Sequence, residues 1–222
     1  MQENDLLRAG LIQPRAKKEG EVARVYRLIK GWILQGRARP GEFLAEMDLA
    51  RLCKTSRTPV REACSRLSQE GWLAHLRHKG YMVPPISVRE IVDVYEFRRM
   101  LEGFTAEKAA STATEAQIAT LREALVSERK PGATQGDLLQ ANHQVHLGLA
   151  EIAGNRRVLD QLRRTLEFVD RLDILSLEKD AHAVFHDEIV RSIESRQPRA
   201  ARRAMASHID SARDRMLRLF GS

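Results

Sequence analysis

The stretch SRTPVREACSRLSQEG, residues 56 to 71, carries the clearest structural signal in this chain. Pro59 suits the first turn of a helix, where its missing N–H removes no hydrogen bond, and Ser56 or Thr58 can supply the capping oxygen. Gly71 stands where such a helix is expected to end. An apolar face recurs at i, i+3, i+4 and i+7, and it consists of Val60, Ala63, Cys64 and Leu67. The stretch therefore predicts a short helix with one buried face.

A different face of this predicted helix carries two arginines and a hydroxyl. Arg57, Arg61 and Ser65 recur at four-residue intervals, so they lie together and away from the apolar face. Guanidinium and hydroxyl groups bond phosphates and base edges. We therefore predict a DNA-recognition helix that binds through Arg57, Thr58, Arg61 and Ser65.

Two further helices precede this one. Helical spacing predicts a helix from Glu21 to about Gln35 and a shorter one from about Glu46 to Cys53. A tight link, residues 54–56, joins the shorter helix to the recognition helix. Helix, short turn and helix form the unit that presents its second helix to the major groove of DNA.

After the recognition helix the pattern becomes extended. Residues 72–76 and 81–84 predict a hairpin, and its tip consists of Arg77, His78, Lys79 and Gly80. A basic wing beside a helix-turn-helix is expected to contact phosphates or the minor groove, the alternative being a solvated turn. Pro84-Pro85 predicts the domain boundary. The expected division is a tail at 1–19, which either touches DNA or has no role, a winged helix-turn-helix at 20–85 and a second domain at 86–222.

Positive charge gathers in the first of these regions. Residues 1–85 hold 16 of the 37 Lys and Arg and 9 of the 30 Asp and Glu, so all of the net charge of +7 lies there. A basic module joined to a neutral one is typical of a DNA-binding protein with a regulatory or dimerising domain. Cys53 and Cys64 are expected to be reduced core residues. Because the sequence has neither a signal peptide nor a long apolar run, we expect a cytoplasmic protein without membrane contact.

The second domain is predicted to be entirely helical. Helical spacing and turn residues predict about six helices in an antiparallel bundle with short connections. Their expected ranges are 87–111, 115–130, 136–153, 156–176, 179–195 and 198–219. The expected fold class is therefore mainly α, with a small β-hairpin wing.

Three histidines lie on the apolar faces of the third, fifth and sixth helices predicted for this domain. His146 follows Asn142 by one turn, and His186 and His208 each lie eleven residues from Gln197. If the chain makes a hairpin at Gln197, His186 and His208 face each other about 16 Å along the helices. Neutral imidazole is a common ligand of divalent metals, so a metal site is one hypothesis. The other hypothesis is that they are core histidines, which bond backbone carbonyls or the carboxylates of Asp187 and Asp210. His182, one turn before His186, is a possible substitute ligand.

At this point the residues resemble a known family. GRARPGEFLAEMDLARLCKTSRTPVREACSRLSQEGWL and the HKGYMV wing resemble the winged helix-turn-helix of GntR-type bacterial transcription regulators. VYEFRRMLE at 94–102, HLGLAEIAGN at 146–155 and the 22-residue interval from His186 to His208 resemble the FCD ligand-binding domain of the FadR-like branch.

The resemblance implies a metal and an effector. Members of this branch hold a divalent metal through one Asp and three His, which places Asn142, His146, His186 and His208 at the ligand positions. Asn142 stands where the family has Asp, so a weaker site for Zn, Ni or Mn is expected. Arg98 matches the arginine that binds a small carboxylate effector. Met47 stands where some members place a DNA-contacting arginine, so that contact is expected to be missing.

Three functions follow from these observations. The leading hypothesis is a homodimeric regulator that binds a palindromic operator and responds to a small organic acid. The second is a metal-responsive regulator without an organic effector. The third is a metal-dependent enzyme, which we do not expect because no nucleophile or general base accompanies the candidate ligands.

Overall fold

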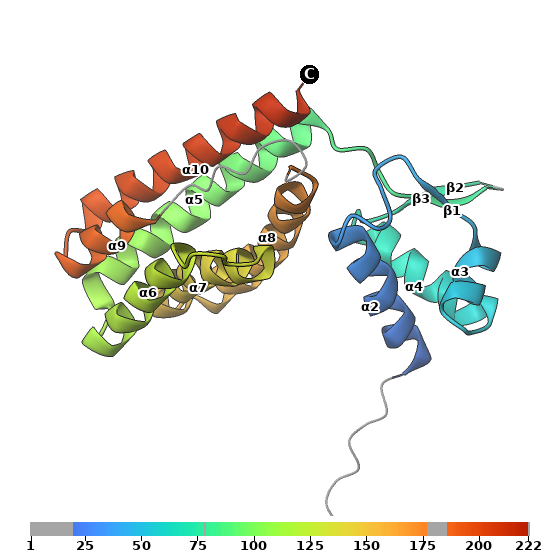
Figure 1. Ribbon diagram of the computed structural model, residues 1–222, viewed down its shortest axis with the longest axis horizontal. Coiled ribbons are helices and arrows are strands. Elements are labelled where there is room, and N and C mark those ends of the chain that lie inside the picture. The colour runs from blue at the N-terminus through green and yellow to red at the C-terminus, as the bar shows by residue number, and fades with distance from the viewer. Residues whose placement is uncertain (1–19, 78, 177–185, 222) are drawn as a thin grey trace, which may run out of the picture. The chain divides into compact units, whose positions relative to one another are not determined.

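A computed structural model describes residues 20–77, 79–176 and 186–221. The chain divides into two compact units (Figure 1). The first contains the described residues up to Ile33 and Ala38–Pro84, and the second contains Leu34–Arg37 and the residues from Pro85 onward. The expected fold class is confirmed, because the first unit is a helix-turn-helix with a small β-sheet and the second is helical.

The described part of the first unit has three helices, α2 (Glu21–Leu34), α3 (Glu46–Leu52) and α4 (Arg57–Gln69). Helix α4 is the predicted recognition helix, and its expected apolar face is fully buried. The expected hydroxyl cap is wrong: Ser56 is the N-cap, but its side chain makes no capping hydrogen bond. A capping oxygen accepts from the N–H of the second or third helical residue, and Pro59, the third, has none, so one of the two possible donors is missing.

The wing is a three-stranded antiparallel sheet. Strands β2 (Ala74–Leu76) and β3 (Gly80–Met82) confirm the predicted hairpin. A strand that the sequence did not predict, β1 (Phe43–Leu44), pairs with the other edge of β3. Two residues are too few to show the alternation of a strand. Gly80 has a φ of +94°, and a Cβ there would lie 2.8 Å from the Leu44 carbonyl oxygen, so only glycine lets β1 pair here.

The described part of the second unit is a bundle of six helices. They are α5 (Val88–Thr112), α6 (Glu115–Glu128), α7 (Gln135–Ala153), α8 (Arg156–Ser176), α9 (Asp187–Glu194) and α10 (Pro198–Phe220). Five of them lie within two residues of their predicted ends. The sixth, expected at 179–195, is seen from Asp187, because residues 177–185 lie outside the described part. None of the described helices is long and apolar enough to span a membrane.

Helix α5 forms the centre of this bundle. It lies alongside α10 and also packs against α7, α8 and α9 (Figure 1). Its buried face begins with Ile91 and Tyr95 and ends with small residues such as Ala106 and Ala109. Between them the same face carries Arg98 and Glu102, both buried. The bundle therefore encloses two charged side chains of α5 where a helix of this kind normally places apolar ones.

Candidate functional site

The residues of α4 that are predicted to contact DNA lie on its exposed side. Arg57, Thr58, Arg61 and Ser65 are all exposed, opposite the buried face of the helix. The side chains of Arg57 and Arg61 keep 65% and 63% of their surface accessible. The structure therefore brings these four predicted residues together on one accessible surface of the helix-turn-helix.

Glu46, the first residue of α3, holds both arginines in the DNA-free chain. Its carboxylate accepts two hydrogen bonds from Arg61, Nε to Oε1 at 3.0 Å and a terminal nitrogen to Oε2 at 2.9 Å, and one from Arg57 at 3.4 Å. The bond from Arg61 is the main reason that the pKa of Glu46 is lowered. Sequence reasoning missed Glu46, because its partners lie 11 and 15 residues away and only the turn between the helices brings them together.

The wing tip is only partly described. Arg77 and Lys79 are exposed, as the prediction of a DNA-contacting wing requires. Gly80 is half-buried, and its conformation and its contact with β1 give it a structural role in the sheet. His78 lies outside the described residues.

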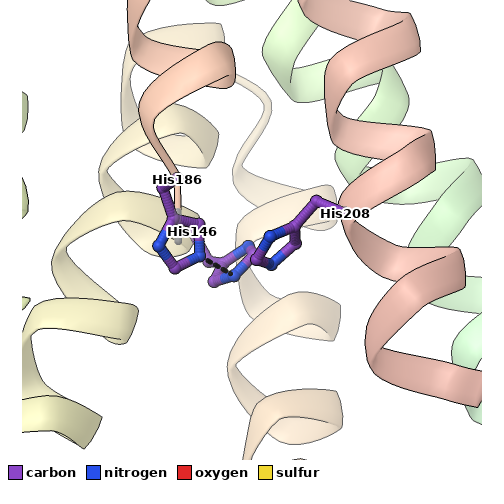
Figure 2. Close-up of side chains that lie close together, drawn as sticks. All are labelled: His146, His186 and His208. Carbon is purple, nitrogen blue, oxygen red and sulfur yellow. Dashed lines mark hydrogen bonds between the residues drawn. The ribbon is translucent and has the colours of Figure 1, made fainter. Parts of the chain in front are cut away.

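The three predicted histidines form one cluster inside the bundle (Figure 2). His146 comes from α7, His186 is the N-cap of α9 and His208 comes from α10. Their ring centroids lie 4.3–5.2 Å apart, and they offer one nitrogen each within 4.8 Å of the others. The exposed fractions are 0%, 2% and 9%. The predicted hairpin at Gln197 thus brings His186 and His208 face to face, and His182 lies outside the described residues.

Two of the rings turn the same nitrogen toward each other. The Nε2 atoms of His146 and His186 are 3.0 Å apart, while the Nδ1 atoms contact the carboxylates of Glu102 and Glu128 respectively. A carboxylate only accepts, so each Nδ1 is the donor to its carboxylate, and a ring that is neutral then has a lone pair on Nε2. Two lone pairs at this distance repel each other unless a proton or a metal ion lies between them. Burial lowers the pKa of His146 to about 4, which disfavours the proton at neutral pH.

The sequence offered Asp187 and Asp210 as partners of the buried histidines, and the described contacts of both carboxylates are with arginines. Asp187 is paired with Arg129, and Asp210 with Arg99 and Arg213. The carboxylates at His146 and His186 are Glu102 and Glu128 instead. His143, which the helical spacing put off the apolar face, bonds Asp170 outside the cluster, at 3.0 Å.

Arg98, the predicted effector residue, lies next to this cluster. Its guanidinium is 2% exposed, donates to Glu102 Oε1 at 2.6 Å and has a terminal nitrogen 3.5 Å from His146 Nε2. Burial acts to raise the pKa of Glu102, but Arg98 and His146 outweigh it and lower the pKa to about 2. Glu102 is therefore ionised and occupies the donor face that a carboxylate ligand would use.

Asn142 is the predicted fourth ligand, and no described contact joins it to the three histidines. Asn142 is half-buried, one turn before His146 on α7. Glu102 and Glu128 were missed in the sequence. A signal for Glu102 was present, because it falls four residues after Arg98 on the apolar face of α5. Glu128 gave none, since it ends α6 and reaches His186 across 58 residues.

Comparison with known proteins gives one family match for each unit. Residues 21–83 match the family described as bacterial regulatory proteins, gntR family, and residues 93–211 match the FCD domain. The chain is 35% identical over 130 residues to the Nta operon transcriptional regulator of Aminobacter aminovorans, a match that spans 58% of this chain and 62% of that relative. It is 26% identical over 191 residues to the HTH-type transcriptional repressor RspR of Escherichia coli, which covers 83% of this chain and 84% of the relative.

Solved structures show the same fold. E. coli McbR/YncC superposes with a TM-score of 0.71 at 17% identity, covering 90% of this chain and 98% of that one. A putative GntR regulator from Rhodococcus sp. RHA1 gives a TM-score of 0.67 at 24% identity, with coverage of 88% and 97%. The two sequence relatives carry the names of a transcriptional regulator and a transcriptional repressor. This chain belongs to the GntR family of DNA-binding transcriptional regulators and carries an FCD domain after its winged helix-turn-helix.

Proposed function

We propose that this regulator binds a palindromic operator as a homodimer, and that a divalent metal and a small carboxylate in the bundle change its operator affinity. The observation that carries the DNA part is the exposed pair Arg57 and Arg61 on α4, opposite a fully buried face. Half-sites about one helical turn apart follow from a two-fold arrangement of two such helices.

The metal part rests on the chemistry of the donors. Three buried imidazoles converge, and two of them present Nε2 lone pairs to one point. Such a set fits Zn²⁺ or Ni²⁺, which accept imidazole ligands, with Asn142 as a further oxygen ligand. A bound metal supplies a positive charge that joins α7, α9 and α10 and attracts a carboxylate.

The effector part rests on Arg98. Its guanidinium already binds one carboxylate, that of Glu102, and it lies beside His146. A small organic acid would replace Glu102 at Arg98 and face the metal with its other end. The burial of Arg98 and its occupation by Glu102 favour a second candidate, a regulator that responds to the metal alone.

A second copy of the chain is the proposed occupant of an exposed apolar stripe on α5. Phe97, Met100 and Phe104 lie one and two turns apart and are 36%, 67% and 42% exposed. Two antiparallel copies of α5 related by a two-fold axis between residues 100 and 101 would place Phe97 on Phe104 of the other copy. The same axis would place Asp93 near Lys108 of the other copy, so the two copies would pair opposite charges beside the apolar stripe.

DNA binding is tested with the upstream region of the gene itself, measured by fluorescence anisotropy at two salt concentrations. The R57A/R61A double variant is expected to lose roughly 2–6 kcal/mol of operator affinity, since a bidentate base contact contributes about 1–3 kcal/mol. The matched control is R164A, an exposed arginine on α8. Unchanged binding by the double variant would refute the assignment of the DNA-reading residues.

The effector is tested by thermal unfolding of metal-free and metal-loaded protein with a series of small mono- and dicarboxylates. A true ligand raises the midpoint progressively, because its stabilisation grows as RT ln(1 + [L]/Kd). A midpoint that rises with both metal and acid, together with a change in operator affinity, supports the leading function. Metal alone changing operator affinity, with no further effect of any acid, supports the second candidate.

The dimer is tested by sedimentation. M100E places two carboxylates at the two-fold axis and is expected to give a monomer with weakened operator binding. V126E is the control, because Val126 on α6 is 72% exposed and outside the stripe. A dimer that persists in M100E would show that the two copies meet elsewhere.

A further inference from the structure

Two carboxylates stand directly behind the histidine cluster. Glu102 Oε2 contacts His146 Nδ1 and Glu128 Oε1 contacts His186 Nδ1, so each carboxylate occupies the ring nitrogen that points away from the cluster. The side chain of Glu102 is 0% exposed and that of Glu128 is 8% exposed. Both rings are therefore held as the tautomer whose Nε2 atom is available to a ligand.

Glu102 is paired with Arg98, whereas the buried carboxylate of Glu128 has no described ion pair with Lys or Arg, and an unpaired buried carboxylate is costly. Glu128 Oε2 is buried and has no hydrogen-bond partner among the described residues. Its described contact is with Nδ1 of His186. A carboxylate at this depth is stabilised when positive charge develops on the imidazole side, as it does when the ring binds a metal ion.

The ligand positions themselves hold no acid. Among the described residues, the cluster joins three histidines and no Asp or Glu, and Asn142 is an amide. Arg98 also brings a positive charge to within 3.5 Å of His146 Nε2, which opposes a cation. Within the described residues, the negative charge nearest to the three rings is therefore that of the carboxylates behind them.

We infer that Glu102 and Glu128 are positioning residues that set the metal affinity of this site, by orienting His146 and His186 as Nε2 ligands and by supplying, through the rings, the negative charge that Asn142 lacks. The inference rests on the proposed metal site. Glu102 has a second task, because it also neutralises Arg98. The loss of Glu102 is therefore expected to weaken metal binding more than the loss of Glu128.

The test measures Zn²⁺ affinity by competition with a chromophoric chelator, using the whole chain. E128Q and E102Q keep the shape of the side chain and remove its charge. The matched controls are E123Q, an exposed acid on α6, and E96Q, an exposed acid on α5. E128Q is expected to bind Zn²⁺ about 10- to 100-fold more weakly and E102Q to fall at or beyond the upper end of that range, with both controls unchanged.

Co²⁺ spectra separate positioning from ligation. A residue that ligates the ion changes the d–d bands when it is replaced, whereas a positioning residue lowers the affinity and leaves the bands of the saturated complex in place. We expect unchanged bands for E128Q and altered bands for H186A. E128Q is the decisive variant, because E102Q also leaves Arg98 buried without its partner and can fail to fold.

The outcomes distinguish this inference from the proposed metal site. Wild-type protein that binds no Zn²⁺ and no Co²⁺ would overturn the metal site and the inference with it. Wild-type binding that H186A abolishes and E128Q leaves within twofold would overturn the inference and keep the site. N142D, which returns a carboxylate to a ligand position, is expected to raise the affinity and to reduce the effect of E128Q.

Discussion

Two Arg–Glu pairs of the same chemistry lie in opposite environments. In the first unit Arg61 pairs with Glu46, and the arginine keeps 63% of its side chain exposed. In the second unit Arg98 pairs with Glu102, and the two are 2% and 0% exposed. Water competes for the first pair, so it contributes at most about 1 kcal/mol and opens readily. The second is dehydrated, so removing either partner leaves a buried charge. Arg57 and Arg61 can thus exchange their carboxylate partner for DNA as proposed, whereas Arg98 is held by Glu102.

The largest expected effect comes from breaking the buried pair. E102A leaves the guanidinium of Arg98 without its carboxylate, and we expect the free energy of unfolding to fall by about 3–5 kcal/mol. Urea unfolding of the metal-free protein measures this. R98M/E102L replaces both charges with apolar side chains and is expected to recover most of the loss. If E102A stays within 1 kcal/mol of the wild type, water reaches this pair and the contrast with the surface pair fails.

The stability of the buried site is expected to decrease in acid. Burial lowers the pKa of His146 to about 4, below its ordinary value of 6.5, so the unfolded chain binds the proton more readily between these values. Stability is therefore greatest above pH 6.5 and is lost as the pH falls toward 4, by about 2 kcal/mol between pH 7 and pH 5 for this group. Glu102, with a pKa lowered to about 2, adds a further loss below pH 4.5.

The measurement for this prediction is urea unfolding of the metal-free protein at pH 7 and at pH 5. In H146Q the part of the pH dependence between these values that belongs to His146 disappears. The H143Q variant is a control with the opposite sign, because a hydrogen bond to Asp170 raises the pKa of His143. A wild-type stability that does not decrease on acidification would contradict the burial argument.

The smallest effect is expected at the surface pair. E46Q removes the charge that holds Arg57 and Arg61, and stability should change by less than about 1 kcal/mol. Affinity for random-sequence DNA should rise a few-fold, since one negative charge near the phosphates is lost. The preference for operator over random DNA should fall, because the two guanidinium groups are no longer oriented. Urea unfolding measures the stability, and anisotropy with both DNAs at two salt concentrations measures the affinity and the preference. The control is E62Q, an exposed acid on α4.

Periodicity was sufficient for most of the fold because long amphipathic helices repeat their signal many times. The ends of α5, α6, α7, α8 and α10 were predicted within two residues for this reason. It failed where an element was too short, as at β1, and where a neighbouring residue removed a bond, as Pro59 did for the cap at Ser56. Both failures are local and left the fold class unaffected.

The candidate sites divide in the same way. The positions of Arg57, Arg61 and the three histidines were visible because each lies on a helix face that its own sequence defines. Their partners were not visible, because Glu46, Glu102 and Glu128 contact them across the turn or across the bundle. The spacing of residues along one helix says nothing about which side chain stands on the facing helix.

By itself, the sequence determined that this chain carries an exposed basic recognition helix, a helical bundle behind it and three histidines on the faces that point into that bundle. These are properties of single elements, set by the periods of 3.6 and 2 and by turn residues. Tertiary structure alone decided that Glu46 binds Arg57 and Arg61 and that Glu102 pairs with Arg98. It also decided that His146 and His186 turn their Nε2 atoms toward each other. Those contacts depend on how elements pack, and packing brings together charges that no local pattern connects.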